Sequence, residues 1–316
     1  MSDFSNLNLR KHGICTLKSV VSDAFLEWLA QGMARSKAKS FAIKGEQIAP
    51  AISQSADSSK TVYLGRGVFM QQDLLAWLAR EEVFKLLSLE INEDLSLANN
   101  MAFEIDTEKK SGLAWHAGIY SFSYIPLATN AWTIWIPLDP ITADQRGGLQ
   151  LVSTSDLDGS YIYQLADDYY YKSLLQAKQK NLIGEKYVDW VSKFDHPFQK
   201  IDACLSQELD SSQIYEPWLM PGDALIFDKF VVHRSSPFLP GNLRRRRGIA
   251  LRVIPSLSVF DRKRFYPFAK HILQLASYDS SLLEPEKRDW FFERLLSERL
   301  HHGQELLALS GLLAKI

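Results

Sequence analysis

The sequence predicts a closed or sandwiched β core that is wrapped by helices. Between residues 97 and 255, a series of short segments is rich in β-branched and aromatic residues and is bounded by Gly, Pro and Asp, which is the pattern of strands. Segments with the helical spacing of apolar residues lie before and after that series. Because 46% of the 316 residues are apolar, the chain can bury a large core.

The first elements are a short strand followed by helices. Residues 13–21 alternate between apolar and polar side chains, as a half-buried strand does. Residues 22–36 follow with a Ser or Asp that can cap a helix, and their apolar residues recur at helical spacing. Residues 72–90 are helical by the same periodicity. We therefore expect a strand and two helices before the β core.

The β core itself is predicted from six segments of similar composition. They are residues 97–106, 113–126, 131–142, 147–155, 223–235 and 246–255.

Two further regions are expected to cover this core. Residues 156–215 are polar and tyrosine-rich and interrupt the strands, so they predict an inserted lid over one mouth of the core. Residues 256–316 contain amphipathic helical patterns and predict a C-terminal helical cover. Since no repeat or Gly/Ser linker divides the chain, residues 1–316 are predicted to form a single domain.

Composition excludes several classes of partner. Lys and Arg number 36 against 37 Asp and Glu, so the net charge of -1 creates no global attraction for nucleic acid or membranes, despite the run LRRRRG at 243–248. Cys15 and Cys204 form no metal-binding pair and indicate no disulfide framework. The first residues have no apolar core like that of a signal peptide, and no apolar run approaches 18 residues. These features favour a soluble cytoplasmic protein and leave its oligomeric state open.

Two of the seven histidines, His116 and His233, fall inside predicted strands. Imidazoles on neighbouring strands of one core can bind Zn, Fe, Cu or Ni, so the pair alone does not identify the metal. Arg246 opens the next strand, 13 residues after His233. A guanidinium there is suited to a carboxylate. A small dicarboxylate could then chelate the metal at one end and meet Arg246 at the other.

The stretch PGDALIFDKFVVHRSSPF, followed by RRGIALRVIP, resembles the distal half of the phytanoyl-CoA dioxygenase superfamily of Fe(II)/2-oxoglutarate enzymes. The N-terminal strand and helix and the segment WTIWIPLDPITADQRGGLQLVS are similar to that family as well, so the resemblance covers about residues 10–255. It implies a double-stranded β-helix, or jelly-roll, core with O2 as co-substrate.

Carried over residue by residue, the resemblance makes His116 and His233 iron ligands and Arg246 the clamp on the distal carboxylate of 2-oxoglutarate. It places Thr133 or Trp135 beside the 2-oxoglutarate. Arg247 is the one-residue alternative for the clamp, and the match disfavours three further arginines, Arg244, Arg245 and Arg252.

One position departs from the family pattern. The proximal motif of the family is His-X-Asp, but this chain has His116-Ala117-Gly118, and glycine supplies no ligand. The acids Glu104, Asp106 and Asp139 lie on other predicted strands or loops. The vacant position could take a chloride ion, and iron/2-oxoglutarate halogenases show this His-X-Ala or His-X-Gly signature.

The resemblance therefore narrows to halogenases associated with polyketide and peptide synthetases, with Gly118 as the seat of chloride. It implies chlorination of an unactivated aliphatic carbon on a small molecule or on an acyl or aminoacyl group tethered to a carrier protein. Two other interpretations stay open. One is a hydroxylase of the same family. The other is a catalytically inactive relative, in which the acid was simply lost or in which Gly118 serves a β-bulge or a close approach of the backbone.

Overall fold

The computed structural model describes most of the region that is predicted to form the core. The described residues are 9–42, 61–66, 68–69, 71–106, 113–122, 125–160, 162, 179–180, 197–239, 245–259 and 261. Most of the predicted lid, and nearly all of the predicted C-terminal cover, lie outside these residues.

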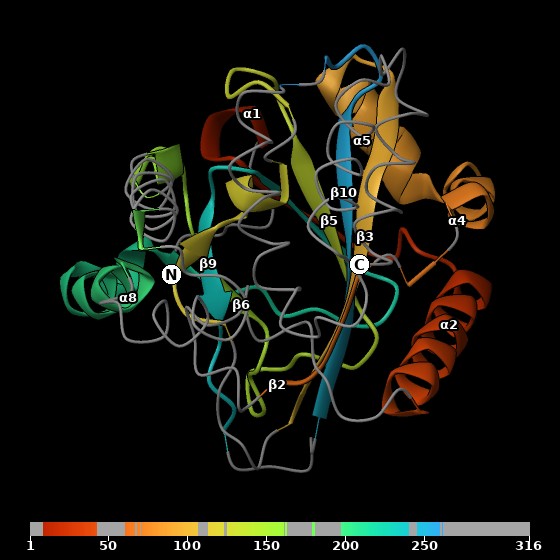
Figure 1. The fold of residues 1–316 in the computed structure, drawn as a ribbon, viewed down its shortest axis with the longest axis horizontal. Coiled ribbons are helices and arrows are strands. Elements are labelled where there is room, and N and C mark those ends of the chain that lie inside the picture. The colour runs from red at the N-terminus through yellow and green to blue at the C-terminus, as the bar shows by residue number, and fades with distance from the viewer. Residues whose placement is uncertain are drawn as a thin grey trace.

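Two antiparallel sheets face each other and form the core (Figure 1). The major sheet has the strand order β1-β8-β5-β10-β3-β2. Its strands are β1 (Ile14–Leu17), β8 (Ala224–Asp228), β5 (Trp132–Pro137), β10 (Arg245–Pro255), β3 (Leu95–Asp106) and β2 (Thr61–Arg66). The minor sheet has the order β4-β9-β6-β7. Its strands are β4 (His116–Ala117), β9 (Val232–Ser235), β6 (Leu149–Val152) and β7 (Ile214–Tyr215). This arrangement confirms the predicted double-stranded β-helix.

Helices cover the outer sides of both sheets. They are α1 (Leu9–His12), α2 (Asp23–Ala42), α4 (Gln71–Leu78), α5 (Glu82–Ile91) and α8 (Pro197–Glu208), with two 3-10 turns, η2 (Gly118–Phe122) and η3 (Ser211–Gln213). Figure 1 shows α2, α4 and α5 beside the major sheet and α8 on the opposite side, beyond β9 and β6.

The layers follow from the alternation of side chains along the strands. On β5, Trp132, Ile134 and Ile136 pack with the apolar residues of the covering helices, whereas Trp135 belongs to the apolar cluster between the sheets. Every residue of β5 is buried because both faces of the strand are covered. Outside the minor sheet, Trp115 and Val232 form a third cluster against residues of α8.

The helical prediction for residues 72–90 is confirmed except at a short break, which divides the segment into two helices, α4 and α5. No Gly or Pro marks this break. Glu81 adopts an extended backbone there, and its buried carboxylate accepts hydrogen bonds from the Ser22 backbone N–H and hydroxyl, both at 2.7 Å. Ser22 in turn caps α2 by accepting a bond from the Phe25 N–H at 3.3 Å. A tertiary contact between helices therefore overrides the helical periodicity.

Two predicted strands also differ from the structure. Among the described residues of the segment 113–126, which are 113–122 and 125–126, the strand is limited to the two-residue β4, and the chain then turns into η2 at Gly118. The segment 223–235 forms two strands, β8 and β9, which belong to different sheets. Between them, Lys229 is buried and donates hydrogen bonds to the backbone carbonyls of Leu127 and Thr129, so the turn itself is part of the core.

No helix in the described part of the chain is long and apolar enough to span a membrane.

Candidate metal centre and adjoining pocket

His116 and His233 face each other on the minor sheet. They are direct partners in the antiparallel pairing of β4 with β9. Their ring centroids lie 4.2 Å apart with an angle of 52° between the ring planes. The predicted presentation of two imidazoles by neighbouring strands is therefore found in the structure.

Backbone carbonyls orient both imidazole rings. Nδ1 of His116 lies 2.7 Å from the Ala114 carbonyl oxygen, and Nδ1 of His233 lies 2.9 Å from the Val231 carbonyl oxygen. A carbonyl oxygen can only accept, so each Nδ1 carries the proton and each Nε2 carries the lone pair that binds a metal. Burial lowers the pKa of His233 well below its ordinary value, and nearby His116 and Arg252 lower it further. The neutral imidazole, which is the form that ligates metals, is thus favoured.

Gly118 lies beside His233, where a Cβ atom would contact the imidazole ring. A Cβ atom at Gly118 would lie 3.7 Å from Cε1 of His233 and 3.6 Å from the Lys229 carbonyl oxygen. Both distances are ordinary van der Waals contacts, so a side chain would fit. Positive φ angles occur at other described glycines, such as Gly147, but not at Gly118. Neither crowding nor backbone conformation therefore requires a glycine here, which removes the support for a bulge or a close approach.

No carboxylate completes the site within the described residues, where no group of three or more His, Cys, Asp or Glu side chains could hold a metal ion. The two acids nearest in the sequence whose side chains are described have other partners. Glu104 forms an ion pair with Lys37 at 2.6 Å, and Asp139 forms one with Arg247 at 2.6 Å. The donor set that the structure brings together is two neutral imidazoles, which fits Fe(II) with its remaining coordination positions open to other ligands.

Arg246 points into the space between the sheets. It is 3% exposed, and its guanidinium donates to the Gly148 carbonyl oxygen and, at 3.4 Å, to the Ser235 hydroxyl. Burial lowers the pKa of Arg246 to about 10, and the charge of Asp139 opposes part of that shift. The side chain is still cationic at neutral pH. A buried cation whose described hydrogen-bond partners are neutral suits an anionic ligand.

Arg247, the alternative for this role, is held on the other face of β10. Its backbone N–H and its guanidinium donate to the Asp139 carboxylate at distances from 2.6 to 3.2 Å. Successive residues of a strand point to opposite faces, so only Arg246 of this adjacent pair lines the pocket.

Arg252 is a second arginine in the pocket, which the family resemblance disfavours only as the clamp on 2-oxoglutarate. It is 5% exposed, donates to the hydroxyl of Thr133 and lies over the Phe122 ring at 5.8 Å. Its position could have been predicted from the strand spacing. Arg246 and Arg252 are an even number of residues apart on one strand, so their side chains lie on the same face.

The pocket encloses about 390 Å³ of space, part of it open to solvent, and joins the histidine pair to both arginines. Thr133 and Trp135, which the family resemblance places beside 2-oxoglutarate, line this pocket, and the Arg246 guanidinium lies 5.6 Å from the centre of the Trp135 ring. The other lining residues are mainly apolar: Phe103, Leu113, Leu149, Phe227, Ser235 and Ala250.

A histidine pair and an inward arginine inside a double-stranded β-helix define the class of non-heme iron, 2-oxoglutarate-dependent enzymes. The family described as phytanoyl-CoA dioxygenase (PhyH) matches residues 9–246, and the chain belongs to this family of Fe/2-oxoglutarate-dependent oxygenases. A search of curated proteins finds no match.

One similar solved structure supports the fold, and two others are similar at lower TM-scores. The non-heme alpha-ketoglutarate-dependent carbocyclase SnoK from nogalamycin biosynthesis is 12% identical, with a TM-score of 0.53 over 82% of this chain and 86% of SnoK. The epimerase SnoN, in complex with Fe3+, alpha-ketoglutarate and nogalamycin RO, is 14% identical, with a TM-score of 0.49 over 80% of this chain and 83% of SnoN. EctD from S. alaskensis, solved with 2-oxoglutarate and 5-hydroxyectoine, is 14% identical, with a TM-score of 0.48 over 83% of this chain and 78% of EctD.

Proposed function

We propose that this protein is an Fe(II)/2-oxoglutarate-dependent halogenase that chlorinates an unactivated aliphatic carbon in natural-product biosynthesis. The observation that carries the proposal is the geometry at Gly118. A Cβ atom at Gly118 would make ordinary van der Waals contacts with His233 and Lys229, so there is room for a side-chain atom beside His233 at the position where this chain lacks the family's carboxylate. Such room, next to a divalent cation, suits a chloride ion.

In this proposal His116 and His233 bind Fe(II) through Nε2, and Arg246 binds the far carboxylate of 2-oxoglutarate, with Trp135 packed beside the guanidinium. When bound, Fe(II) with 2-oxoglutarate and O2 supplies the oxidant: the keto acid becomes succinate and CO2, a C–H bond is replaced by C–Cl, and the second oxygen atom leaves as water.

The charges of the pocket support an additional anion. Arg246 and Arg252 are both cationic and buried, and Fe(II) would add two more positive charges. The positive charge of the two arginines and Fe(II) exceeds the two negative charges of 2-oxoglutarate. No acid of the described site offsets the remaining positive charge. Chloride at Gly118 would supply the charge that an aspartate brings in the rest of the family.

The apolar walls of the pocket favour an aliphatic segment as substrate. Phe103, Leu149 and Phe227 offer no hydrogen bonds, and they exclude water from the reacting carbon. The substrate in this proposal is a small molecule or an acyl or aminoacyl group on a carrier protein. The side chain of Arg245 at the start of β10 is 57% exposed and lies 4.0 Å from the Glu104 carboxylate, and in this proposal its exposed part meets an acidic carrier.

The test is an anaerobic titration of the Fe(II)-loaded protein with 2-oxoglutarate, with and without chloride, followed by the metal-to-ligand charge-transfer absorbance. We expect a band that shifts when chloride is added. Absence of any band would refute the assignment of the iron and 2-oxoglutarate sites. A band that is insensitive to chloride would favour the family's alternative activity, hydroxylation of the same kind of carbon.

The substitution pair Gly118→Ala and Gly118→Asp sharpens the test. Alanine fits the measured space and brings no ligand, so chloride sensitivity should persist. Aspartate occupies the same space and brings a carboxylate, so chloride sensitivity should be lost while iron is retained. Equal behaviour of the two variants would show that chloride does not bind at this position.

A further inference from the structure

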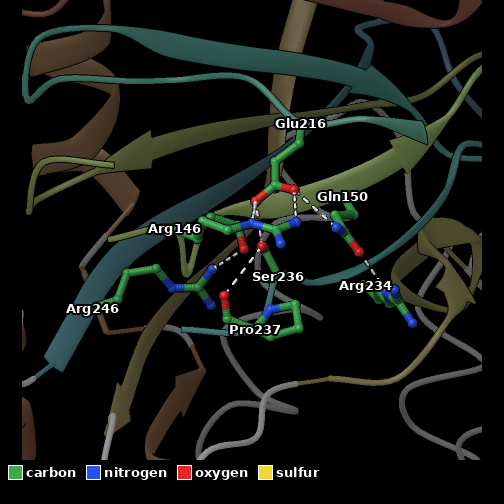
Figure 2. Close-up of polar contacts among 8 residues, drawn as sticks. Arg146, Gln150, Glu216, Arg234, Ser236, Pro237 and Arg246 are labelled. Carbon is green, nitrogen blue, oxygen red and sulfur yellow. Dashed lines mark hydrogen bonds and ion pairs between the residues drawn. The ribbon is translucent and has the colours of Figure 1, made fainter. Parts of the chain in front are cut away.

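A polar cluster centred on Glu216 lies next to the proposed clamp but contacts no ligand site. Glu216 directly follows β7, and its side chain is 11% exposed. Arg146 donates to both carboxylate oxygens, one of them at 2.9 Å. Gln150 donates through Nε2 at 2.9 Å, and the Ser236 hydroxyl donates as well. Figure 2 shows these donors converging on the one carboxylate.

The cluster and Arg246 meet at a single backbone atom, the carbonyl oxygen of Gly148. The Ser236 N–H donates to this oxygen at 2.9 Å, and the Arg246 guanidinium donates to it from the pocket side. The position of Gly148 depends on the turn before it, where Arg146 and Gly147 have positive φ angles of 54° and 79°. A left-handed backbone at a non-glycine residue costs about 1–2 kcal/mol, and the ion pair with Glu216 offsets that cost at Arg146.

We propose that Glu216 is a positioning residue for the 2-oxoglutarate clamp, acting through the Arg146 turn and Ser236 to fix the Gly148 carbonyl and, with it, the direction of the Arg246 guanidinium. This inference rests on the proposed role of Arg246 in binding 2-oxoglutarate. Without the Glu216 charge, the Arg146 turn and Ser236 lose the acceptor that they share. The Gly148 carbonyl, which accepts from both Ser236 and Arg246, is then less firmly positioned.

The donors around Glu216 suit a positioning role better than a binding role. A carboxylate offers about four lone-pair sites, and the hydrogen bonds from Arg146, Gln150 and Ser236 use them. Burial raises the pKa of Glu216, but these hydrogen bonds outweigh it and hold the pKa below its ordinary value. The carboxylate is therefore ionised at neutral pH and fully engaged by the protein.

The iron ligands are linked to Glu216 less directly, through Gln150, which donates to Glu216, and Arg234. Arg234, which follows His233, donates to Gln150 Oε1 at 2.7 Å and to the Ser206 hydroxyl of α8 at 3.1 Å. Its guanidinium also lies 4.6 Å from the centre of the Trp115 ring. These contacts do not involve Glu216 directly, so loss of Glu216 should disturb Arg246 more than the histidine pair.

The test compares Glu216→Gln with Glu104→Gln in the full-length protein. Glu104 is a matched control, because its side chain is 7% exposed and also forms an ion pair, with Lys37, but on the helix-covered side of the major sheet. Fe(II) affinity is measured first. The dissociation constant of 2-oxoglutarate is then measured anaerobically from the charge-transfer absorbance of the Fe(II)-loaded protein.

We expect Glu216→Gln to raise the dissociation constant of 2-oxoglutarate about tenfold, at the lower end of what outer-shell substitutions cost, while Fe(II) affinity stays at the wild-type value. Glu104→Gln should change neither. An unchanged 2-oxoglutarate affinity in Glu216→Gln would overturn the inference, as would an equal loss of Fe(II) affinity. Should that variant fail to fold, Arg146→Lys keeps the charge but not the paired hydrogen bonds, and it should show a smaller shift in the same direction; no shift would overturn the inference. A wild-type protein without any 2-oxoglutarate band would instead contradict the proposed function.

Discussion

Replacing Arg246 with methionine should make the ligand-free protein more stable while destroying its affinity for 2-oxoglutarate. Burial lowers the pKa of Arg246 to about 10, and the difference from the ordinary arginine value corresponds to about 3 kcal/mol that the folded protein spends to keep this charge buried. Loss of the hydrogen bond to the Gly148 carbonyl costs about 1 kcal/mol in the variant. The free energy of unfolding should therefore rise by about 2 kcal/mol, as for other buried charges replaced by apolar groups.

The same substitution removes the cation that would meet the ligand carboxylate. Truncating one partner of a buried charge pair costs about 2–5 kcal/mol, so the dissociation constant of 2-oxoglutarate should rise at least about 30-fold. Denaturant unfolding and the anaerobic charge-transfer titration measure the two effects. Arg247→Met is the control: it breaks the ion pair with Asp139 outside the pocket, so it should lower stability and leave 2-oxoglutarate affinity unchanged. A less stable Arg246→Met protein, or one that binds 2-oxoglutarate normally, would refute the reasoning.

Other predictions follow from single contacts. Gly118→Asp should abolish chlorination and keep iron bound, whereas Gly118→Ala should keep both, as measured by product analysis and metal content. Gly248→Ala should cost about 1–3 kcal/mol of unfolding free energy, because its Cβ would meet the Trp135 ring at 2.8 Å, and it should also weaken 2-oxoglutarate binding. Glu81→Ala should lower the unfolding free energy by about 1–3 kcal/mol by leaving the donors of the α2 cap unsatisfied. The ionised Glu216 stabilises the fold at pH values above the ordinary glutamate pKa, and this contribution is lost as the pH falls through the lower pKa of the folded protein. In Glu216→Gln, the free energy of unfolding should therefore fall less steeply as the pH is lowered.

The β core and the histidine pair could be predicted because they depend on local pattern. The β-branched and aromatic composition of β3, β5 and β10 is enough to predict these strands from the sequence. His116 and His233 stood out because an imidazole is unusual within such segments. Their direct pairing on β4 and β9 then followed from the fold.

The missed features depend on tertiary contacts that a local pattern does not contain. The break between α4 and α5 exists because Glu81 turns inward to bind Ser22 of another helix. The division of 223–235 into two strands depends on the buried ammonium of Lys229, whose acceptors are carbonyls about a hundred residues away. The family pattern requires one arginine as the clamp on 2-oxoglutarate, so it does not predict that Arg252 lies on the same inward face of β10 as Arg246.

The distribution of the site over both sheets has a mechanical consequence. His116 and His233 belong to the minor sheet, while Arg246 and Arg252 belong to the major sheet. In the proposed complex, 2-oxoglutarate would touch iron at one end and Arg246 at the other, and so would act as a removable cross-link between the two halves of the sandwich. Any sliding or opening of the sheets would have to break that cross-link. Ligand binding would therefore stabilise the paired sheets by an amount that grows with the logarithm of the ligand concentration divided by the dissociation constant.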